Sequence, residues 1–368
     1  MECDAKELAK ALTRARDFLG SSLSNPALKC FRFEGRFVEA ADYDLAAKLN
    51  LPEGLDFKAP VLVPGAECQA IVAKLSGRVT VEADEKAVRI ADGGSKFRLA
   101  TMASGGFPAF PAEPAKYAPA PLVCQAVKAV KAFAGDPKRT QIYAGVRIDD
   151  DQVIAGDEKF RALCVARMPA QTGIQAIVGM SFANLFATSA EDTELGCDGR
   201  RLFLRSADGV VCGPTIEGRY ADYRKATAGY QLPDVFTFKH QDLKEAIEKI
   251  VVLAKDDPTE ETGITRAIFT FGEGRMTLAS SVGAHEARAE LAAQGSGSGC
   301  LHLNVALISN WVRSAKCDSV TMSCNIRSPR VIRFTGQAEL SDGRAMDLTV
   351  YVCPMIPAAK EKPGEEKD

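Results

Sequence analysis

Three histidines and one run of carboxylates are the residues whose types could support catalysis in this chain. His240, His285 and His302 stand far apart, and none has a metal-ligating partner at the usual spacing. Asp149–Asp151 leaves two interpretations open, the tip of a hairpin or a site for a divalent cation such as Mg²⁺. The sequence contains no phosphate-cradling glycine loop and no G-x-S-x-G nucleophile pattern. We therefore predict no catalytic residues, no metal site and no cofactor, which favours a binding or scaffolding role over an enzyme.

Length and composition describe a globular protein of more than one domain. The chain has 368 residues, which predicts two or three domains, and its formal charge of −2 shows no overall basic excess. Eleven cysteines are scattered without a C-x-x-C pair, and no signal peptide is recognisable. No apolar run approaches the roughly 20 residues that cross a membrane. We expect a soluble, cytoplasmic protein with free thiols.

Helical periodicity defines the first element, over residues 4–19. Its apolar residues share one face at helical spacing, namely Leu8, Ala11, Leu12, Ala15 and Leu19. A basic stripe follows at i, i+4 and i+8, through Lys6, Lys10 and Arg14. On the residues alone, such a stripe is typical of a solvated helix face.

Strands and helices then recur in a repeating order. Further helices are predicted at 64–74, 122–133, 179–190 and 304–316, and another carries Leu243, Ile247, Ile250 and Val251 inward. Hairpins and short strands lie between them, with Glu34–Gly35 as one turn. The order repeats on a period of about 110 to 120 residues. This predicts an α+β chain of three similar domains, at 1–117, 118–233 and 234–357, followed by a charged, disordered tail at 358–368.

The last apolar stretch, Leu348–Pro357, begins as a strand and loses its ability to continue a ladder at Pro354. Two interpretations apply to it: a core strand that ends the last domain, or one wall of an apolar pocket for another protein's peptide.

Several of these stretches together resemble the bacterial DNA polymerase III β sliding clamp family. Gly218–Lys225 is similar to that family's G-R-[FY]-P-x-Y-x-[RK] run, and Phe107–Pro108 to the F-P that closes its first domain. Val350–Met355 resembles its terminal Y-x-V-M-P-M, and Asn304–Cys324 its last helix and strand. The resemblance covers nearly the whole chain in order, with matching length and period.

The sequence departs from the family pattern in places. Ala221 stands where the family usually has Pro, and Cys353 replaces a Met. Gly156–Ala162 stands for the family's T-D-G-H-R-L, and Asn25 and Ala66 occupy positions that are often Arg. These changes mark a divergent member.

The resemblance implies a DNA clamp fold in which each domain has two βαβββ-like halves and two chains form a head-to-tail ring. Such a ring is a processivity factor: it encircles double-stranded DNA without sequence preference and tethers partners. Those implied are the replicative DNA polymerase, the clamp loader and repair factors that carry clamp-binding peptides. The implied location is cytoplasmic and nucleoid-associated, with no membrane contact.

The resemblance also assigns residues. It implies DNA contact through basic side chains on the lining helices and one loop: Lys6, Lys10, Arg14, Lys74, Lys128, Lys131, Arg139, Lys244 and Arg313. It implies a peptide pocket between the second and third domains at Tyr143, Gly145, Phe160, Arg161, Ala162, Val331, Val352, Cys353, Pro354 and Met355. It implies a dimer interface that pairs Val72, Leu75, Phe97 and Leu99 with Val252 and Leu253.

Two alternatives remain. A clamp-like scaffold that no longer encircles DNA would bind proteins only. A metal-dependent hydrolase would use Asp149–Asp151 with Mg²⁺.

Overall fold

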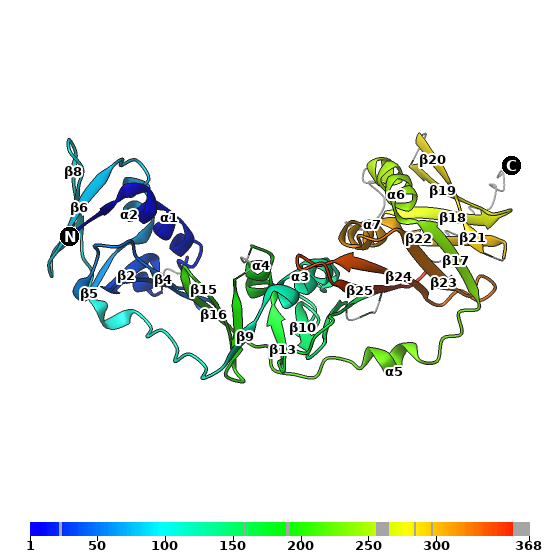
Figure 1. Cartoon of the computed structure of the whole chain (residues 1–368), viewed down its shortest axis with the longest axis horizontal. Coiled ribbons are helices and arrows are strands. Elements are labelled where there is room, and N and C mark those ends of the chain that lie inside the picture. Colours follow the sequence, from blue (N-terminus) through cyan, green and yellow to red (C-terminus); the bar gives the residue numbers. More distant parts are fainter. Residues whose placement is uncertain are drawn as a thin grey trace, which may run out of the picture. The chain divides into compact units, whose positions relative to one another are not determined.

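The computed structural model describes residues 1–21, 24–157, 159, 161–188, 192–254, 265–282, 285–295 and 297–355, and the chain divides into two compact units. The first unit comprises Met1–Pro121 and Thr188–Thr215, and the second comprises Leu122–Ala187 and Ile216–Asp368. The predicted α+β class is confirmed, with helices packed on antiparallel sheets (Figure 1). The division into three similar domains near 117 and 233 stays a prediction.

The first unit contains two sheets. The smaller has the order β1 (Glu2–Asp4), β6 (Arg78–Ala83), β7 (Ala87–Ala91) and β8 (Lys96–Ala100). The larger has the order β5 (Phe57–Pro64), β2 (Cys30–Gly35), β3 (Phe37–Ala41), β4 (Ala46–Asn50), β16 (Gly209–Pro214), β15 (Arg201–Ser206), β14 (Glu194–Cys197) and β9 (Tyr117–Pro119). Its helices are α1 (Ala5–Arg16) and α2 (Gly65–Val72), with 3₁₀ turns at Pro26–Lys29 and Ser104–Gly106.

The second unit also contains two sheets. The larger has the order β13 (Gln175–Gly179), β10 (Gly145–Asp149), β11 (Gln152–Gly156), β12 (Ala162–Arg167), β25 (Ala345–Val352), β24 (Ile332–Glu339), β23 (Ser319–Cys324), β17 (Asp234–Lys239) and β21 (Gln294–Gly295). The smaller has the order β20 (His285–Ala292), β19 (Arg275–Val282), β18 (Arg266–Gly272) and β22 (Gly299–Asn304). Its helices are α3 (Pro121–Val130), α4 (Met180–Thr188), α5 (Tyr223–Thr227), α6 (His240–Ala254) and α7 (Val305–Ser314), with a 3₁₀ turn at Lys131–Phe133.

The first helix shows why the sequence folds as it does locally. Asp4 caps α1, because its carboxylate accepts the backbone N–H groups of Lys6 and Glu7 at 2.9 and 3.2 Å. The predicted apolar face is buried through Leu8, Leu12 and Ala15. The helix packs beside α2 and over β3 and β4 (Figure 1).

The last long helices bury their predicted faces in the same way. Leu243, Ile247 and Ile250 of α6 are fully buried, and Val251 is 5% exposed. On α7, Trp311 is fully buried and its ring lies 5.9 Å from that of Phe334. Helix α6 packs against α7 and over strands β19 and β20. Within the described residues, no helix combines the length and the apolar character that crossing a membrane requires.

The two large sheets repeat one arrangement. In each, four consecutive strands form one half, and its edge strand pairs with a strand from later in the chain. The joining pairs are β4 with β16 and β12 with β25, both antiparallel. The two large sheets therefore share one strand arrangement, while the threefold repeat expected from the sequence stays a prediction.

The carboxylate run at Asp149–Asp151 forms the tip of the β10–β11 hairpin. Asp150 has a positive φ of 56°, and its carboxylate accepts the backbone N–H of Gly173 at 2.9 Å. Asp149 pairs with Arg147 at 3.0 Å, and Asp151 lies 3.9 Å from Arg167. Each carboxylate thus has its own local role in the turn. The described part of the chain holds no group of three or more His, Cys, Asp or Glu arranged to bind a metal.

Candidate functional site

The end of β25 forms one wall of a pocket of about 460 Å³ in the second unit. Beyond Val352, backbone bonds hold the chain to both of its neighbours. The Cys353 N–H donates to the Arg161 carbonyl at 2.9 Å, and the Met355 N–H donates to the His302 carbonyl at 2.7 Å. Cys353, Pro354 and Met355 are half-buried and line the pocket. The predicted pocket wall is therefore a fixed segment that exposes side chains.

The opposite walls come from segments far apart in the sequence. The chain after α3 contributes the apolar Phe133, the start of β12 contributes Ala162, and α7 contributes Leu307. The remaining lining residues are Ala132, Ala134, Gly135, Asp136, Asp157, Arg161, Arg266 and Asn304. The pocket combines apolar lining residues with a few charged groups, a composition that is common in ligand-binding sites.

Two of the charged groups form a local pair, Asp157 with Arg161. Asp157 is 8% exposed and accepts both the backbone N–H of Arg161, at 2.7 Å, and its Nε–H, at 2.5 Å. Burial, with a smaller effect from Asp157, raises the pKa of the Cys353 thiol. Cys353 is therefore a neutral, weakly polar wall residue near neutral pH. Burial and then the charge of Arg266 lower the pKa of His302, so this ring is neutral too.

Five of the ten residues implied for the pocket line it: Arg161, Ala162, Cys353, Pro354 and Met355. Four others lie behind or beside it. Val352 and Val331 are 0% and 5% exposed, Tyr143 packs on the ring of Tyr220 at 5.0 Å, and Gly145 pairs with Gly179 in the sheet. Phe160 lies outside the described residues. Sequence reasoning missed the Ala132–Asp136 loop and Leu307, because nothing local marks them.

The basic stripe of α1 is solvent-exposed but partly neutralised. Arg14 forms an ion pair with Asp208, from the turn between β15 and β16, and Lys10 Nζ lies 3.9 Å from the same carboxylate. Lys6, at the start of α1, and Lys74, after α2, are also exposed. The first unit therefore presents cations on helices, with one carboxylate set among them.

A second set of cations belongs to the other unit. Lys128 and Arg313 line a common cavity of about 550 Å³ together with Lys316. Arg313 Nε also lies 3.6 Å from Glu248, and Lys131 Nζ donates to Asn184 Oδ1 at 2.8 Å. Of the other implied DNA contacts, Arg139 is exposed in the loop before β10 and Lys244 is half-buried on α6.

The residues implied for a dimer interface differ in exposure. Val72 is fully buried, and Leu75 and Leu99 are each 9% exposed, while Phe97 is half-buried on β8. Val252 is 70% exposed on α6. Leu253 belongs to the same helix, and its side chain lies outside the described part.

Comparison with known proteins gives one consistent result for the fold. No protein-family model matches the sequence. Solved structures match almost end to end. The DNA polymerase sliding clamp of Pseudomonas aeruginosa has a TM-score of 0.80 at 15% identity, covering 97% of this chain and 99% of that one. The DNA polymerase III β subunit of Thermotoga maritima has a TM-score of 0.78 at 20% identity, with 97% and 99% covered.

The Helicobacter pylori β clamp, in a structure bound to a DNA ligase peptide, matches with a TM-score of 0.80 at 17% identity, covering 97% of this chain and all of that one. This chain therefore has the fold of the bacterial β sliding clamps, as expected from its motifs.

Proposed function

We propose that this chain is a DNA sliding clamp, a non-enzymatic processivity factor that encircles duplex DNA and tethers a replicative polymerase. The observation that carries the proposal is the likeness over 97% of the chain to clamps from three bacteria. A ring holds DNA by topology, so it needs neither catalytic residues nor sequence-specific contacts. The proposed location is the cytoplasm, at the nucleoid.

Two sheet edges support a head-to-tail ring of two chains. Strand β8 ends the small sheet of the first unit, and β20 ends the small sheet of the second. An edge strand carries backbone groups that another chain can pair with. We propose that β8 of each protomer pairs with β20 of the other, which closes after two copies. Phe97 on β8 and the exposed Val252 on α6, which packs on β20, would then pack across the contact.

Exposed cations on the helices support loose contact with DNA. Lys6, Lys10 and Arg14 lie on α1, and Lys128 and Arg313 lie on α3 and α7. Their charges attract phosphates without reading bases, which keeps sliding easy. The near-neutral net charge of the chain means that this attraction is local rather than global.

The pocket at Cys353–Met355 supports the tethering of partners. Its apolar lining fits a short peptide that carries Leu and Phe, and Met355 can repack around different guests. The polymerase, the clamp loader and repair factors are the proposed donors of such peptides. The H. pylori clamp bound to a DNA ligase peptide is a precedent among the similar structures.

The mass in solution tests the ring. Analytical ultracentrifugation should give about twice the chain mass of 39.4 kDa at micromolar concentration. A monomer at concentrations well above those used for DNA binding would overturn the proposed two-chain ring.

A clamp-like scaffold that does not encircle DNA is the second candidate. The observation that favours it is that Asp208 pairs with Arg14 and lies near Lys10, and that Arg313 contacts Glu248. These pairs weaken the field that would attract phosphates. A scaffold would bind peptides at the pocket but would not stay on DNA whose ends are blocked.

A further inference from the structure

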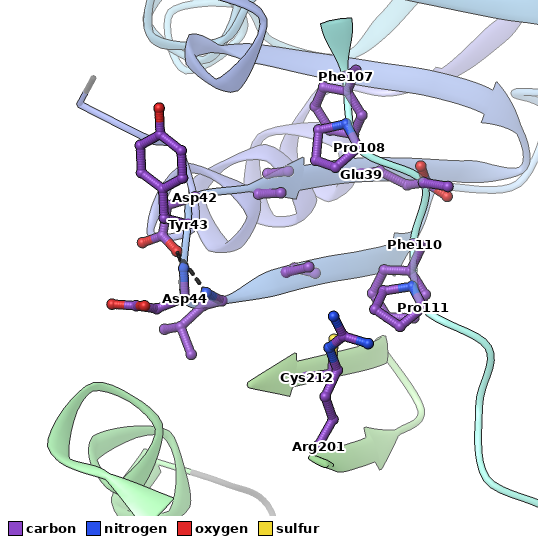
Figure 2. A pocket seen from close by; sticks show the side chains of 16 residues that line it. Glu39, Asp42, Tyr43, Asp44, Phe107, Pro108, Phe110, Pro111, Arg201 and Cys212 are labelled. Atoms are coloured by element: carbon purple, nitrogen blue, oxygen red, sulfur yellow. Dashed lines mark hydrogen bonds between the residues drawn. The ribbon is translucent and has the colours of Figure 1, made fainter. Parts of the chain in front are cut away.

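The first unit contains a pocket of about 150 Å³ between the β3–β4 hairpin and the segment Phe107–Pro111 (Figure 2). It does not overlap the pocket at Cys353–Met355, because every residue that lines it belongs to the first unit. No motif singled out in the sequence assigns a role to it. Its origin becomes clear when the two large sheets are compared strand by strand.

Residues opposite one another across adjacent strands form equivalent rows in the two sheets. In the second unit, Gly156 pairs with Leu163, which pairs with Tyr351. In the first unit, the row at the same place is Ala41, Ala46 and Cys212. A leucine and a tyrosine are thus replaced by an alanine and a cysteine. Because these side chains are smaller, they leave an empty space above the sheet of the first unit at this point.

The segments that lie over these two rows also differ, and the one in the first unit fills less of the space above the sheet. In the second unit, Tyr220 packs on Leu163 and is 2% exposed, and its hydroxyl bonds to the N–H and the carbonyl of Gly156 at 2.9 and 3.3 Å. In the first unit, Phe107 and Phe110 cover the sheet but stay half-exposed. The filled core of one repeat is an open pocket in the other.

The floor of this pocket is apolar, with one cation beside it. Ala46, Cys212 and Phe110 belong to one packed cluster. Burial raises the pKa of Cys212 to about 12, so the thiol stays protonated at neutral pH, although the neighbouring Arg201 acts in the opposite direction. A volume of about 150 Å³ is that of one benzene-sized group. The volume therefore fits one large apolar side chain.

The rim adds a charge preference. Asp42 and Asp44 stand together on one side, where the Asp42 carboxylate accepts the N–H groups of Asp44 and Leu45 at 2.7 and 2.5 Å (Figure 2). Among the described residues, neither carboxylate has an ion pair. Glu39 is already paired with Arg32 at 2.7 Å, and the cation Arg201 lies by Cys212 rather than by Asp42 and Asp44 (Figure 2), so the charge on the Asp42–Asp44 side is negative. A cation beside the apolar group would be attracted there.

We propose that this pocket is a second docking site, which takes a linear peptide of a partner protein with one Phe- or Leu-sized anchor and an adjacent Lys or Arg. The anchor fills the space above Ala46 and Cys212, and the cation lies against Asp42 and Asp44. Pro108 and Pro111 stiffen the covering segment, which lowers the entropy lost on binding. The site is independent of the proposed DNA function.

Three synthetic peptides test the site on the full-length protein by fluorescence anisotropy. They share Gly-Ser flanks around Arg-Phe-Lys, Arg-Ser-Lys or Glu-Phe-Glu. The Arg-Phe-Lys peptide should bind saturably, and the other two at least about tenfold more weakly. No saturable binding of the first peptide, or equal binding of the charge-reversed one, would overturn the proposal.

Substitutions then locate the binding. Ala46→Leu restores the side chain found at the equivalent Leu163 and should weaken the Arg-Phe-Lys peptide about tenfold by filling the pocket. Asp44→Lys should also weaken binding of this peptide, because it reverses a charge on the rim. Glu85→Lys, a charge reversal at another exposed turn, should leave binding unchanged. Met355→Asp must leave the binding intact. If Met355→Asp removes it, or if Asp44→Lys leaves it unchanged in a folded protein, the site is refuted. Loss of dimer mass on peptide addition would instead assign the pocket to a second copy of this chain and contradict the proposal.

Discussion

Asp208 and Arg14 form an ion pair that joins the β15–β16 turn to the basic face of α1, although the two residues come from distant parts of the sequence. Both side chains are 45% exposed, so the pair is screened by solvent and contributes little to stability. If α1 contacts DNA as proposed, the Asp208 carboxylate would compete with phosphates for the Arg14 guanidinium.

Asp208→Asn should strengthen binding to duplex DNA, by roughly threefold to tenfold at low salt, because Arg14 and Lys10 become available. The slope of log affinity against log salt should steepen by up to about 0.9 for each new phosphate contact. Fluorescence titrations at several salt concentrations measure both. Asp84→Asn is the matched control, since Asp84 has the same exposure and also pairs with an arginine, Arg89. If both variants gained the same DNA affinity, the gain would be due to the change in net charge and not to the release of Arg14.

Met355→Asp should weaken binding of a Leu- and Phe-containing polymerase tail peptide at least tenfold, about 1.4 kcal/mol. The new carboxylate would be buried by the peptide without a partner. Isothermal calorimetry gives the affinity. Met102→Asp, at a methionine 39% exposed in the other unit, serves as control. Unchanged peptide binding in Met355→Asp would show that the peptide does not bind at this pocket.

Cys353 should be alkylated by iodoacetamide more slowly than the exposed Cys300 near neutral pH. Its raised pKa leaves less thiolate, the reactive form, and the rate should rise only above the ordinary thiol range. Asp157→Asn should speed the reaction, because removing the negative charge lowers that pKa, and a pocket-bound peptide should slow it. Site-resolved mass spectrometry reports each cysteine. Alkylation of Cys353 as fast as that of Cys300 would show that the pocket wall is not buried as described.

Val252→Glu should weaken the proposed dimer by a factor of ten or more, because a charge would be buried at the contact. Sedimentation over a range of concentrations measures the dissociation constant. Val235→Glu, at another exposed valine, tests whether any surface charge has this effect. A dimer that is unaffected by the change at Val252 would place the interface elsewhere.

Sequence periodicity predicted the elements well where local forces decide them. The buried face of α1 and the hairpin interpretation of Asp149–Asp151 both depend on neighbours in the chain, and the structure shows both. The end of the last strand was predicted less accurately, because Val352 was expected in the pocket wall. Val352 remains in β25 and is fully buried, so the exposed wall starts at Cys353.

Contacts between distant segments could not be read from the sequence. Leu307 lines the pocket at Cys353–Met355 because α7 packs against β25, and no local pattern in the sequence records that packing. Likewise, the exchange of Leu163 and Tyr351 for Ala46 and Cys212 becomes visible only when the strand register is known. Both pockets are therefore set by which residues the tertiary register brings together.

Retention on end-blocked DNA shows whether this protein encircles the duplex. The protein is mixed with linear duplex so that rings can thread over the ends, and both ends are then closed with bound streptavidin. A wash at about 1 M salt, where the screening length is roughly 3 Å, removes electrostatic binding. A ring predicts that protein stays on the blocked DNA and leaves when a restriction enzyme cuts it. Complete loss in the wash by a protein that is still dimeric, or retention after cutting, would contradict encirclement.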